Sequence, residues 1–190
     1  MQKCNVNTEG VPIFLLVGPP GSSKTNLSLK LSRGAGLVHV STGDLLREQM
    51  TDLESSLGKR IRIYSEQGLF VPDEIVTQLL YKRLSREDVL RSGALIVGFP
   101  RTLDQAKALC RDVDNFTVIV LTAEKHQILE HLDGNPPPQF EIRWALYQKD
   151  TVRDAIAYLG TFNPVVEIPF DELAYLSTSS ILKSLNIKAA

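Results

Sequence analysis

Cysteine is scarce in this chain of 190 residues, which contains only Cys4 and Cys110. Two cysteines cannot make a disulfide framework, and neither lies in a C-x-x-C pair or at a zinc-binding spacing from histidine. No apolar run approaches the roughly 18 residues needed to cross a bilayer, and residues 1–10 lack the basic and apolar regions of a signal peptide. These absences exclude a disulfide-stabilised secreted scaffold and a membrane protein, and they predict a cytoplasmic protein in a reducing compartment.

An excess of charge of one sign is also missing. The 21 Lys and Arg residues balance 22 Asp and Glu residues, which leaves a net charge of −1. No global field therefore draws the protein to nucleic acid or to an anionic membrane, and neither is an expected partner. Any phosphate-binding site must be local. The hydrophobic content of 43% and the length are those of one soluble globular domain.

Short apolar runs alternate with helical patterns along the chain, which predicts an α/β fold with a parallel sheet covered on both sides. Ligands of such sheets bind beyond the carboxyl ends of the strands. His39 is expected as a strand residue rather than as a base, and Asp44 as a helix N-cap. The expected strands are residues 11–17, 37–40, 94–97, 118–121 and 165–168. The expected helices include residues 24–31, 61–67, 73–84, 103–110 and 124–132, one long helix over 140–159, and a terminal helix over 175–185.

A glycine-rich segment, Gly18-Pro-Pro-Gly-Ser-Ser-Lys-Thr25, follows the first expected strand and opens the first helix. Backbone N–H groups of such a loop point at an anion, Lys24 neutralises phosphate oxygens, and the Thr25 hydroxyl can ligand Mg²⁺. Ser23 takes the place of the glycine that normally precedes the lysine, so it must accept any strained dihedral that the loop demands. The segment indicates a phosphate-binding loop. The alternative is a turn that binds nothing.

Three further segments follow in order, and together with the glycine-rich loop they resemble the adenylate kinase family of nucleoside monophosphate kinases from about Val11 to Leu121. The resemblance implies a P-loop NTPase-type three-layer αβα fold with a five-stranded parallel sheet. It also implies a single domain with a helical nucleotide-binding insertion at about 41–72 and a truncated lid at about 133–140. The three segments are Ser41-Thr-Gly-Asp-Leu-Leu-Arg47, Gly68-Leu-Phe-Val-Pro-Asp73 and Gly98-Phe-Pro-Arg-Thr-Leu-Asp-Gln105.

The same resemblance assigns residues to two nucleotides and to Mg²⁺. Lys24, Arg101 and Arg143 are implied as the catalytic group, and Thr25 as the protein ligand of the metal. Arginine is the planar donor that grips phosphate oxygens with two parallel bonds, and the Gln105 amide can pair with a purine edge. The implied ATP-binding residues are Gly18, Pro20, Gly21, Ser22, Ser23, Lys24, Thr25 and His131. The implied AMP-binding residues are Thr42, Arg47, Val71, Gly98, Arg101 and Gln105.

The chain departs from the family's pattern on the side of the phosphoryl donor. Val97 stands where the family carries an aspartate that anchors Mg²⁺, and valine cannot ligand a hard cation. His131 and Asn135 stand where the family has two arginines. A loop around residues 136–138 replaces the mobile lid, and the last strand leads into Phe170 without the glycine-containing turn that receives the donor base.

Three functions follow from this combination of motifs and departures. The first is a kinase that transfers the γ-phosphoryl group of ATP to AMP with Mg²⁺, running slowly; UMP or CMP remains open as the acceptor. The second is a pseudoenzyme that binds AMP or another nucleotide as a sensor or scaffold, which implies an unidentified protein partner. The third is a packing module, against which the retained arginines Arg47 and Arg101 argue.

Overall fold

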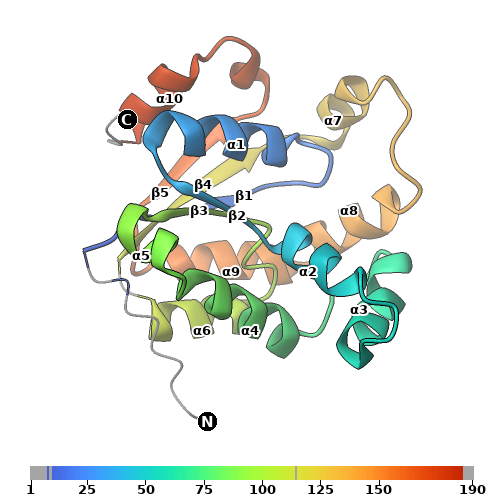
Figure 1. Ribbon diagram of the computed structural model, residues 1–190. Helices are drawn as coiled ribbons and strands as arrows, with labels where there is room; N and C mark the ends of the chain where they lie inside the picture. Colours follow the sequence, from blue (N-terminus) through green and yellow to red (C-terminus); the bar gives the residue numbers. More distant parts are fainter. Residues whose placement is uncertain (1–7, 9, 114, 186–190) are drawn as a thin grey trace.

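Five parallel strands form one sheet, which confirms the expected α/β fold with a five-stranded parallel sheet. The computed structural model describes residues 8, 10–113 and 115–185. Leu15 in the central strand pairs with Ile96 on one side and with Val118 on the other. Figure 1 shows the sheet between two layers of helices. In their order across the sheet, the strands are β2 (Val38–Ser41), β3 (Ala94–Val97), β1 (Ile13–Val17), β4 (Phe116–Thr122) and β5 (Val165–Pro169).

The helices connect these strands and cover both faces of the sheet. α1 and α10 lie on one face, while α4, α6 and α9 lie on the other (Figure 1). None of the helices formed by the described residues is long and apolar enough to cross a membrane. The helices are α1 (Lys24–Ala35), α2 (Thr42–Met50), α3 (Ser56–Glu66), α4 (Asp73–Leu84), α5 (Glu87–Ser92), α6 (Leu103–Asp112), α7 (Lys125–His131), α8 (Phe140–Gln148), α9 (Asp150–Gly160) and α10 (Thr178–Ser184), with a 3-10 turn at Asp171–Ala174.

Alternate residues of β1 enter two different hydrophobic clusters. Leu15 and Val17 pack with residues of α4, α6 and α9, whereas Phe14 and Leu16 pack with residues of α1 and α10. Because successive side chains of a strand point to opposite faces, a strand buried on both faces is apolar at every position. This explains the continuous apolar run that predicts this strand.

The single helix expected over 140–159 is wrong, because the chain breaks at Lys149. The backbone of Lys149 is extended, with φ −58° and ψ 143°, and its N–H donates to the last turn of α8. In α8, Phe140 and Trp144 pack in a small cluster, whereas Tyr147 packs against the main cluster that also holds Leu159 of α9.

Two smaller expectations about helix ends are also wrong. Ser41 rather than Asp44 caps α2, because the Ser41 hydroxyl accepts the Asp44 N–H at 3.2 Å. Asp44 instead pairs with Arg47 one turn later. The terminal helix begins at Thr178 rather than at Tyr175, because the Ser177 side chain caps it by accepting the Ser180 N–H.

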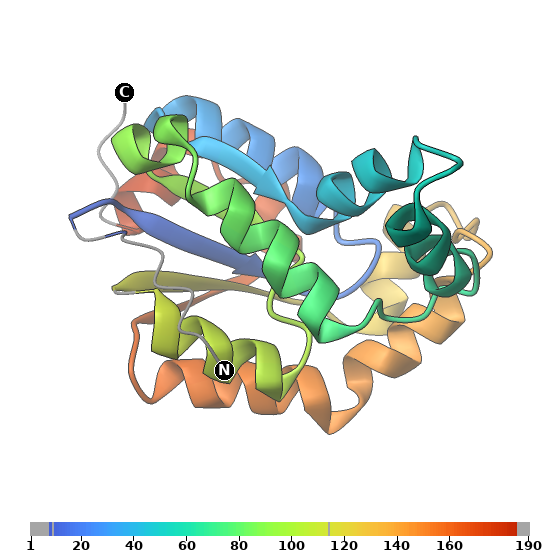
Figure 2. The same ribbon diagram turned by 60° about the horizontal axis from the view of Figure 1, so that its bottom comes forward.

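Helices α2 and α3 project beyond the carboxyl ends of the strands and come beside α8 (Figures 1 and 2). The turn after α3 lies directly against the segment that leads into α8: a Cβ atom on Gly68 would lie 2.7 Å from the Gln139 Cβ atom. The α2–α3 segment and α8 thus enclose the space above the sheet edge, where α/β proteins bind ligands.

Candidate functional site

The loop between β1 and α1 is shaped by close contact with α7. Gly21 has a left-handed backbone with φ +79°, and a Cβ atom there would lie 2.7 Å from Ile128 Cγ2. A side chain at this position is therefore excluded by backbone conformation and by space. The loop carries its backbone N–H groups to the N-terminus of α1, the arrangement that binds phosphate.

Ser23 adopts the strained conformation that the sequence predicts for a residue in place of glycine. It lies in the left-handed region, with φ 52° and ψ 25°, directly before α1. Its hydroxyl contacts His131 Nε2 at 2.8 Å, and the His131 ring meets Phe170 edge-on with ring centroids 5.2 Å apart. The structure thus brings together Ser23 and His131, two of the residues implied for the donor, although 108 positions separate them.

Four cationic side chains surround the mouth of the loop. They line a cavity of about 360 Å³ together with the Thr25 and Ser41 hydroxyl groups. None of the described residues that line this cavity is an aspartate or a glutamate. A concave site that is lined by positive charges and lacks carboxylates attracts anions such as phosphate groups. The four cations are Lys24, Arg47, Arg101 and Arg143.

The cations influence the protonation of one another. Lys24 Nζ donates to the Pro19 carbonyl and, at 3.2 Å, to the Ser22 hydroxyl. Burial and then the nearby Arg101 charge lower the pKa of Lys24 to about 7. Burial and then Arg143 lower the pKa of Arg101 to about 10, so this arginine stays charged at neutral pH.

The lowered pKa of Lys24 predicts a pH-dependent affinity for polyphosphate. An anion favours the charged ammonium group, so binding takes up a proton wherever free Lys24 is neutral. Between pH 7.5 and 9, where the ligand's phosphates are already ionised, the Kd of ATP measured calorimetrically should rise by up to about tenfold per pH unit. A Lys24→Met variant should bind more weakly with a nearly flat profile. Equal slopes for the two proteins would contradict the assignment.

A larger cavity of about 440 Å³ lies between the sheet edge and the α2–α3 segment. All six residues that the resemblance implies for AMP line it, and so does Arg143. Arg62 and Phe70 also line it, although neither was predicted as a site residue. Arg62 donates to the Met50 carbonyl at 2.7 Å. Phe70 lies inside the family motif at residues 68–73, which could have marked it as a site residue. Nothing in the local sequence marks Arg62.

Gly98 holds two of the cavity residues in place. Its carbonyl accepts the Arg101 Nε–H at 2.9 Å and the Thr42 hydroxyl at 3.0 Å. Its φ is +86°, and a Cβ atom there would lie 2.7 Å from the Thr42 hydroxyl oxygen. Arg101 also lies over the Phe70 ring, with its guanidinium carbon 5.5 Å from the ring centroid. These contacts aim Arg101 into the cavity.

A third cavity, of about 230 Å³, joins the glycine-rich loop to the 440 Å³ cavity. Lys24, Gly98, Arg101 and Arg143 line it. Arg101 and Arg143 therefore line all three cavities. The two guanidinium groups stand where a ligand on the loop and a ligand under the α2–α3 segment would meet.

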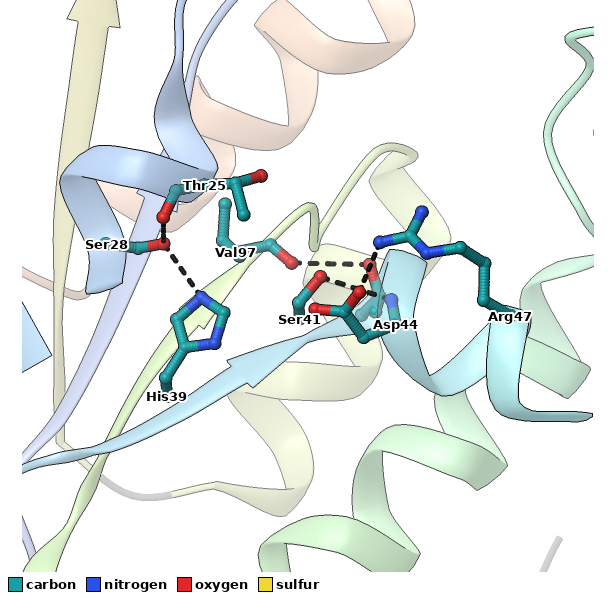
Figure 3. A network of polar contacts seen from close by, with 8 residues as sticks. Thr25, Ser28, His39, Ser41, Asp44, Arg47 and Val97 are labelled. Atoms are coloured by element: carbon teal, nitrogen blue, oxygen red, sulfur yellow. Dashed lines mark hydrogen bonds and ion pairs between the residues drawn. The ribbon is translucent and has the colours of Figure 1, made fainter.

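His39 lies in β2, as the sequence predicts, and its polar contacts are within the fold (Figure 3). Ser28 of α1 donates to the Thr25 carbonyl at 2.8 Å and contacts His39 Nε2 at 2.9 Å. Burial lowers the pKa of His39, against an opposing effect of the Asp44 charge. Burial acts to raise the pKa of Asp44, but hydrogen bonds from Arg47 and Ser41 outweigh it and the pKa is lowered. His39 is thus hydrogen bonded to α1 and feels the charge of Asp44 in α2.

Protein ligands for a metal are few in this site. Among the residues that the structure describes, no group of three or more His, Cys, Asp or Glu side chains could hold a metal ion. Val97, at the end of β3, lines the 360 Å³ cavity and is 4% exposed. Thr25 lines the same cavity, and its hydroxyl is a hard oxygen ligand. Asn135 hydrogen bonds locally to the Asp133 carbonyl.

Comparison with known proteins agrees with the site. The model of the family described as adenylate kinase matches residues 16–163. The adenylate kinase of Caldicellulosiruptor bescii is 37% identical over 151 residues, which cover 74% of this chain and 69% of the relative. Adenylate kinase 8 of Rattus norvegicus is 37% identical over 158 residues, 75% of this chain and 33% of the relative. The adenylate kinase of Chlamydia pneumoniae is 40% identical over 124 residues, 63% of this chain and 57% of the relative. The matched part of the chain thus spans between one third and about two thirds of the length of these relatives.

Proposed function

This chain belongs to the adenylate kinase family, and on that premise we propose that it is a nucleoside monophosphate kinase that transfers the γ-phosphoryl group of ATP to AMP. The observation that carries the proposal is the position of Arg101 and Arg143. Both line the 230 Å³ and 360 Å³ cavities at the glycine-rich loop, which we call the loop-side cavities. Both also line the 440 Å³ cavity, which we propose as the acceptor cavity. A phosphoryl group passing between two nucleotides would travel through this point.

The proposed roles follow from the cavities that each residue lines. Lys24 and the loop amides hold the donor phosphates, while Arg47 and Arg101 hold the acceptor phosphate. Arg143 bridges the two sides and balances the charge on the transferring group. In-line transfer is catalysed by positioning and electrostatic stabilisation, so no side chain need act as a nucleophile or strong base. His131, held by Ser23 and Phe170, is proposed to lie beside the donor base.

Mg²⁺ fits this site as part of the donor nucleotide rather than as a resident metal. Mg²⁺ keeps several waters and is commonly held by one or two protein oxygens together with substrate phosphates. Thr25 offers one such oxygen, and none of the described residues lining the 360 Å³ cavity adds a carboxylate. When bound, the ion would neutralise charge on the β- and γ-phosphates.

The remaining structural assignments are part of the same proposal. Residues 41–72, which contain α2 and α3, are proposed as the nucleotide-binding insertion, and residues 133–140 as a truncated lid. The contact between the Gly68 turn and Gln139 supports this arrangement, because it lets the insertion close directly on the segment before α8. The site covered in this way excludes water less completely than a long lid would, which favours a slow enzyme.

One observation favours a second candidate function. Val97, the last residue of β3, lines the 360 Å³ cavity at the position where the resemblance places the family's aspartate. The described lining of that cavity contains no carboxylate. A chain with intact acceptor residues and an impaired donor site would bind AMP as a sensor or scaffold and act through a protein partner.

The experiment that separates these candidates is ADP formation from ATP, AMP and Mg²⁺ by the purified chain. AMP-dependent ADP formation supports the kinase, whereas AMP binding without any ADP supports the pseudoenzyme. The Val97→Asp variant should form ADP about tenfold faster, because it adds a carboxylate for the hydrated metal. The Val97→Asn variant, of equal size but uncharged, should show no gain. Equal rates for the two variants would contradict the role assigned to Val97.

A further inference from the structure

The side-chain amide of Gln105 is fixed in one orientation by two hydrogen bonds. Its Oε1 accepts the backbone N–H of Arg101 at 2.7 Å, and its Nε2 donates to Asp73 Oδ1 at 2.7 Å. Gln105 is 2% exposed and lines the 440 Å³ cavity. Rotating the amide by half a turn would face two N–H groups toward each other at Arg101 and two oxygens toward each other at Asp73. Both contacts would then be repulsive.

Asp73 is itself held from the other side. Its Oδ2 accepts the Thr102 hydroxyl, and the Thr102 oxygen caps α6 by accepting the Gln105 backbone N–H at 3.1 Å. Both oxygens of the Asp73 side chain are thus engaged by residues at the start of α6. Because these oxygens act as acceptors, Asp73 requires the NH₂ end of the Gln105 amide to face it.

The orientation decides what the amide can still offer to a ligand. An amide has two N–H donors and two acceptor lone pairs, and one of each is already used. One donor and one acceptor remain, side by side. They complement a base whose Watson–Crick edge presents a ring nitrogen acceptor next to an exocyclic amino group, as adenine and cytosine do. Hypoxanthine, guanine and uracil present a ring N–H next to a carbonyl, which is the opposite pattern.

We propose that Asp73 is a positioning residue that sets the specificity for the phosphoryl acceptor. By holding the Gln105 amide in one orientation, it selects AMP and CMP, whose bases present a ring nitrogen acceptor beside an amino group on the Watson–Crick edge, over IMP, GMP and UMP. This inference rests on the proposed function, since it concerns the base of the same acceptor. It narrows the choice that the sequence left open among AMP, UMP and CMP.

The first test compares bases on the unmodified protein. Calorimetric Kd values for AMP and IMP, which differ at the positions that the amide reads, should favour AMP by at least about tenfold, because IMP leaves both amide groups mispaired. CMP should likewise bind more tightly than UMP. Equal Kd values for AMP and IMP would overturn the inference.

The second test separates orientation of the amide from general stability. In Asp73→Ala the amide loses one of its two fixing bonds, so the preference for AMP over IMP should fall by about five- to tenfold. Asp73→Asn keeps one oxygen for Gln105 and should retain the preference. A merely structural role for the first residue of α4 would weaken AMP and IMP equally, and an unchanged ratio in Asp73→Ala would overturn the proposal.

These measurements also separate the inference from the proposed kinase activity. Binding constants need no turnover. A chain that prefers AMP over IMP, loses this preference in Asp73→Ala and forms no ADP would therefore support the role of Asp73 and reject the kinase. A chain that forms ADP but binds AMP and IMP equally would support the kinase and reject the role of Asp73. Equal Kd values for AMP and IMP in the unmodified protein would overturn the inference even if Asp73→Ala does not fold.

Discussion

An Arg101→Ala variant is expected to lose about 10³-fold or more in kcat/KM for ADP formation. Arg101 lines the acceptor cavity and both loop-side cavities, so its removal takes a cation from both nucleotides and from the group in transfer. Its Nε bond to the Gly98 carbonyl and its position over Phe70 hold the guanidinium before any ligand arrives. Such a preorganised charge acts most strongly in the transition state, so kcat should fall as well as affinity.

Steady-state kinetics with varied AMP would measure this effect, and Arg62 offers a matched control. Arg62 lines the acceptor cavity but neither loop-side cavity, and it donates to the Met50 carbonyl. Arg62→Ala should therefore raise the KM for AMP by a few-fold with little change in kcat. An Arg101→Lys variant keeps the charge but loses the planar two-bond grip, so it should be intermediate. Similar losses in Arg62→Ala and Arg101→Ala would contradict the central position of Arg101.

A Lys24→Ala variant is expected to lower kcat by about 10² to 10³-fold, the effect of removing one preorganised donor from a developing charge. Lys24 lines the two loop-side cavities and is absent from the described lining of the acceptor cavity. AMP binding should therefore change little while ATP binding weakens. Lys30→Ala, an exposed lysine of the same helix, should leave both unchanged. Loss of AMP binding together with ATP binding in Lys24→Ala would indicate that this split is wrong.

Thermal denaturation at several pH values tests the lowered pKa of Lys24 independently of ligand binding. The pKa of Lys24 is lowered from 10.5 to about 7 in the fold, so the unfolded chain binds more protons between these two values. The unfavourable contribution of Lys24 to stability is therefore full below pH 7 and disappears as the pH rises toward 10. Lys24→Met should raise the Tm below pH 7, and the gain should vanish near pH 10. A Tm difference that does not depend on pH would show that the fold does not lower the pKa of Lys24.

The sheet and its helices were predictable because each depends on local patterns. The run before Gly18 is apolar at every position because β1 is covered on both faces, and that pattern is visible without the fold. The break at Lys149 was not predictable from periodicity. The residues before and after it carry a continuous helical pattern, and only the structure shows the extended backbone of Lys149 that divides it.

The candidate site divides in the same way. The glycine-rich loop could be predicted with its lysine because a backbone phosphate site is built from consecutive residues. The acceptor residues could be proposed from short motifs, and the structure gathers all six around one cavity. Arg62 could not be found in this way, because its position at the cavity depends on how α3 packs against the end of α2.

The sequence by itself determined the α/β class, the phosphate loop and the family motifs, because these are patterns within stretches of about ten residues. Only the tertiary structure decided how distant side chains combine. Ser23 meets His131 across 108 positions, and Asp73 orients Gln105 across 32. The physical reason is that a hydrogen bond requires two groups within about 3 Å at a suitable angle. That geometry is set by the packing of whole helices on the sheet, which no local pattern encodes.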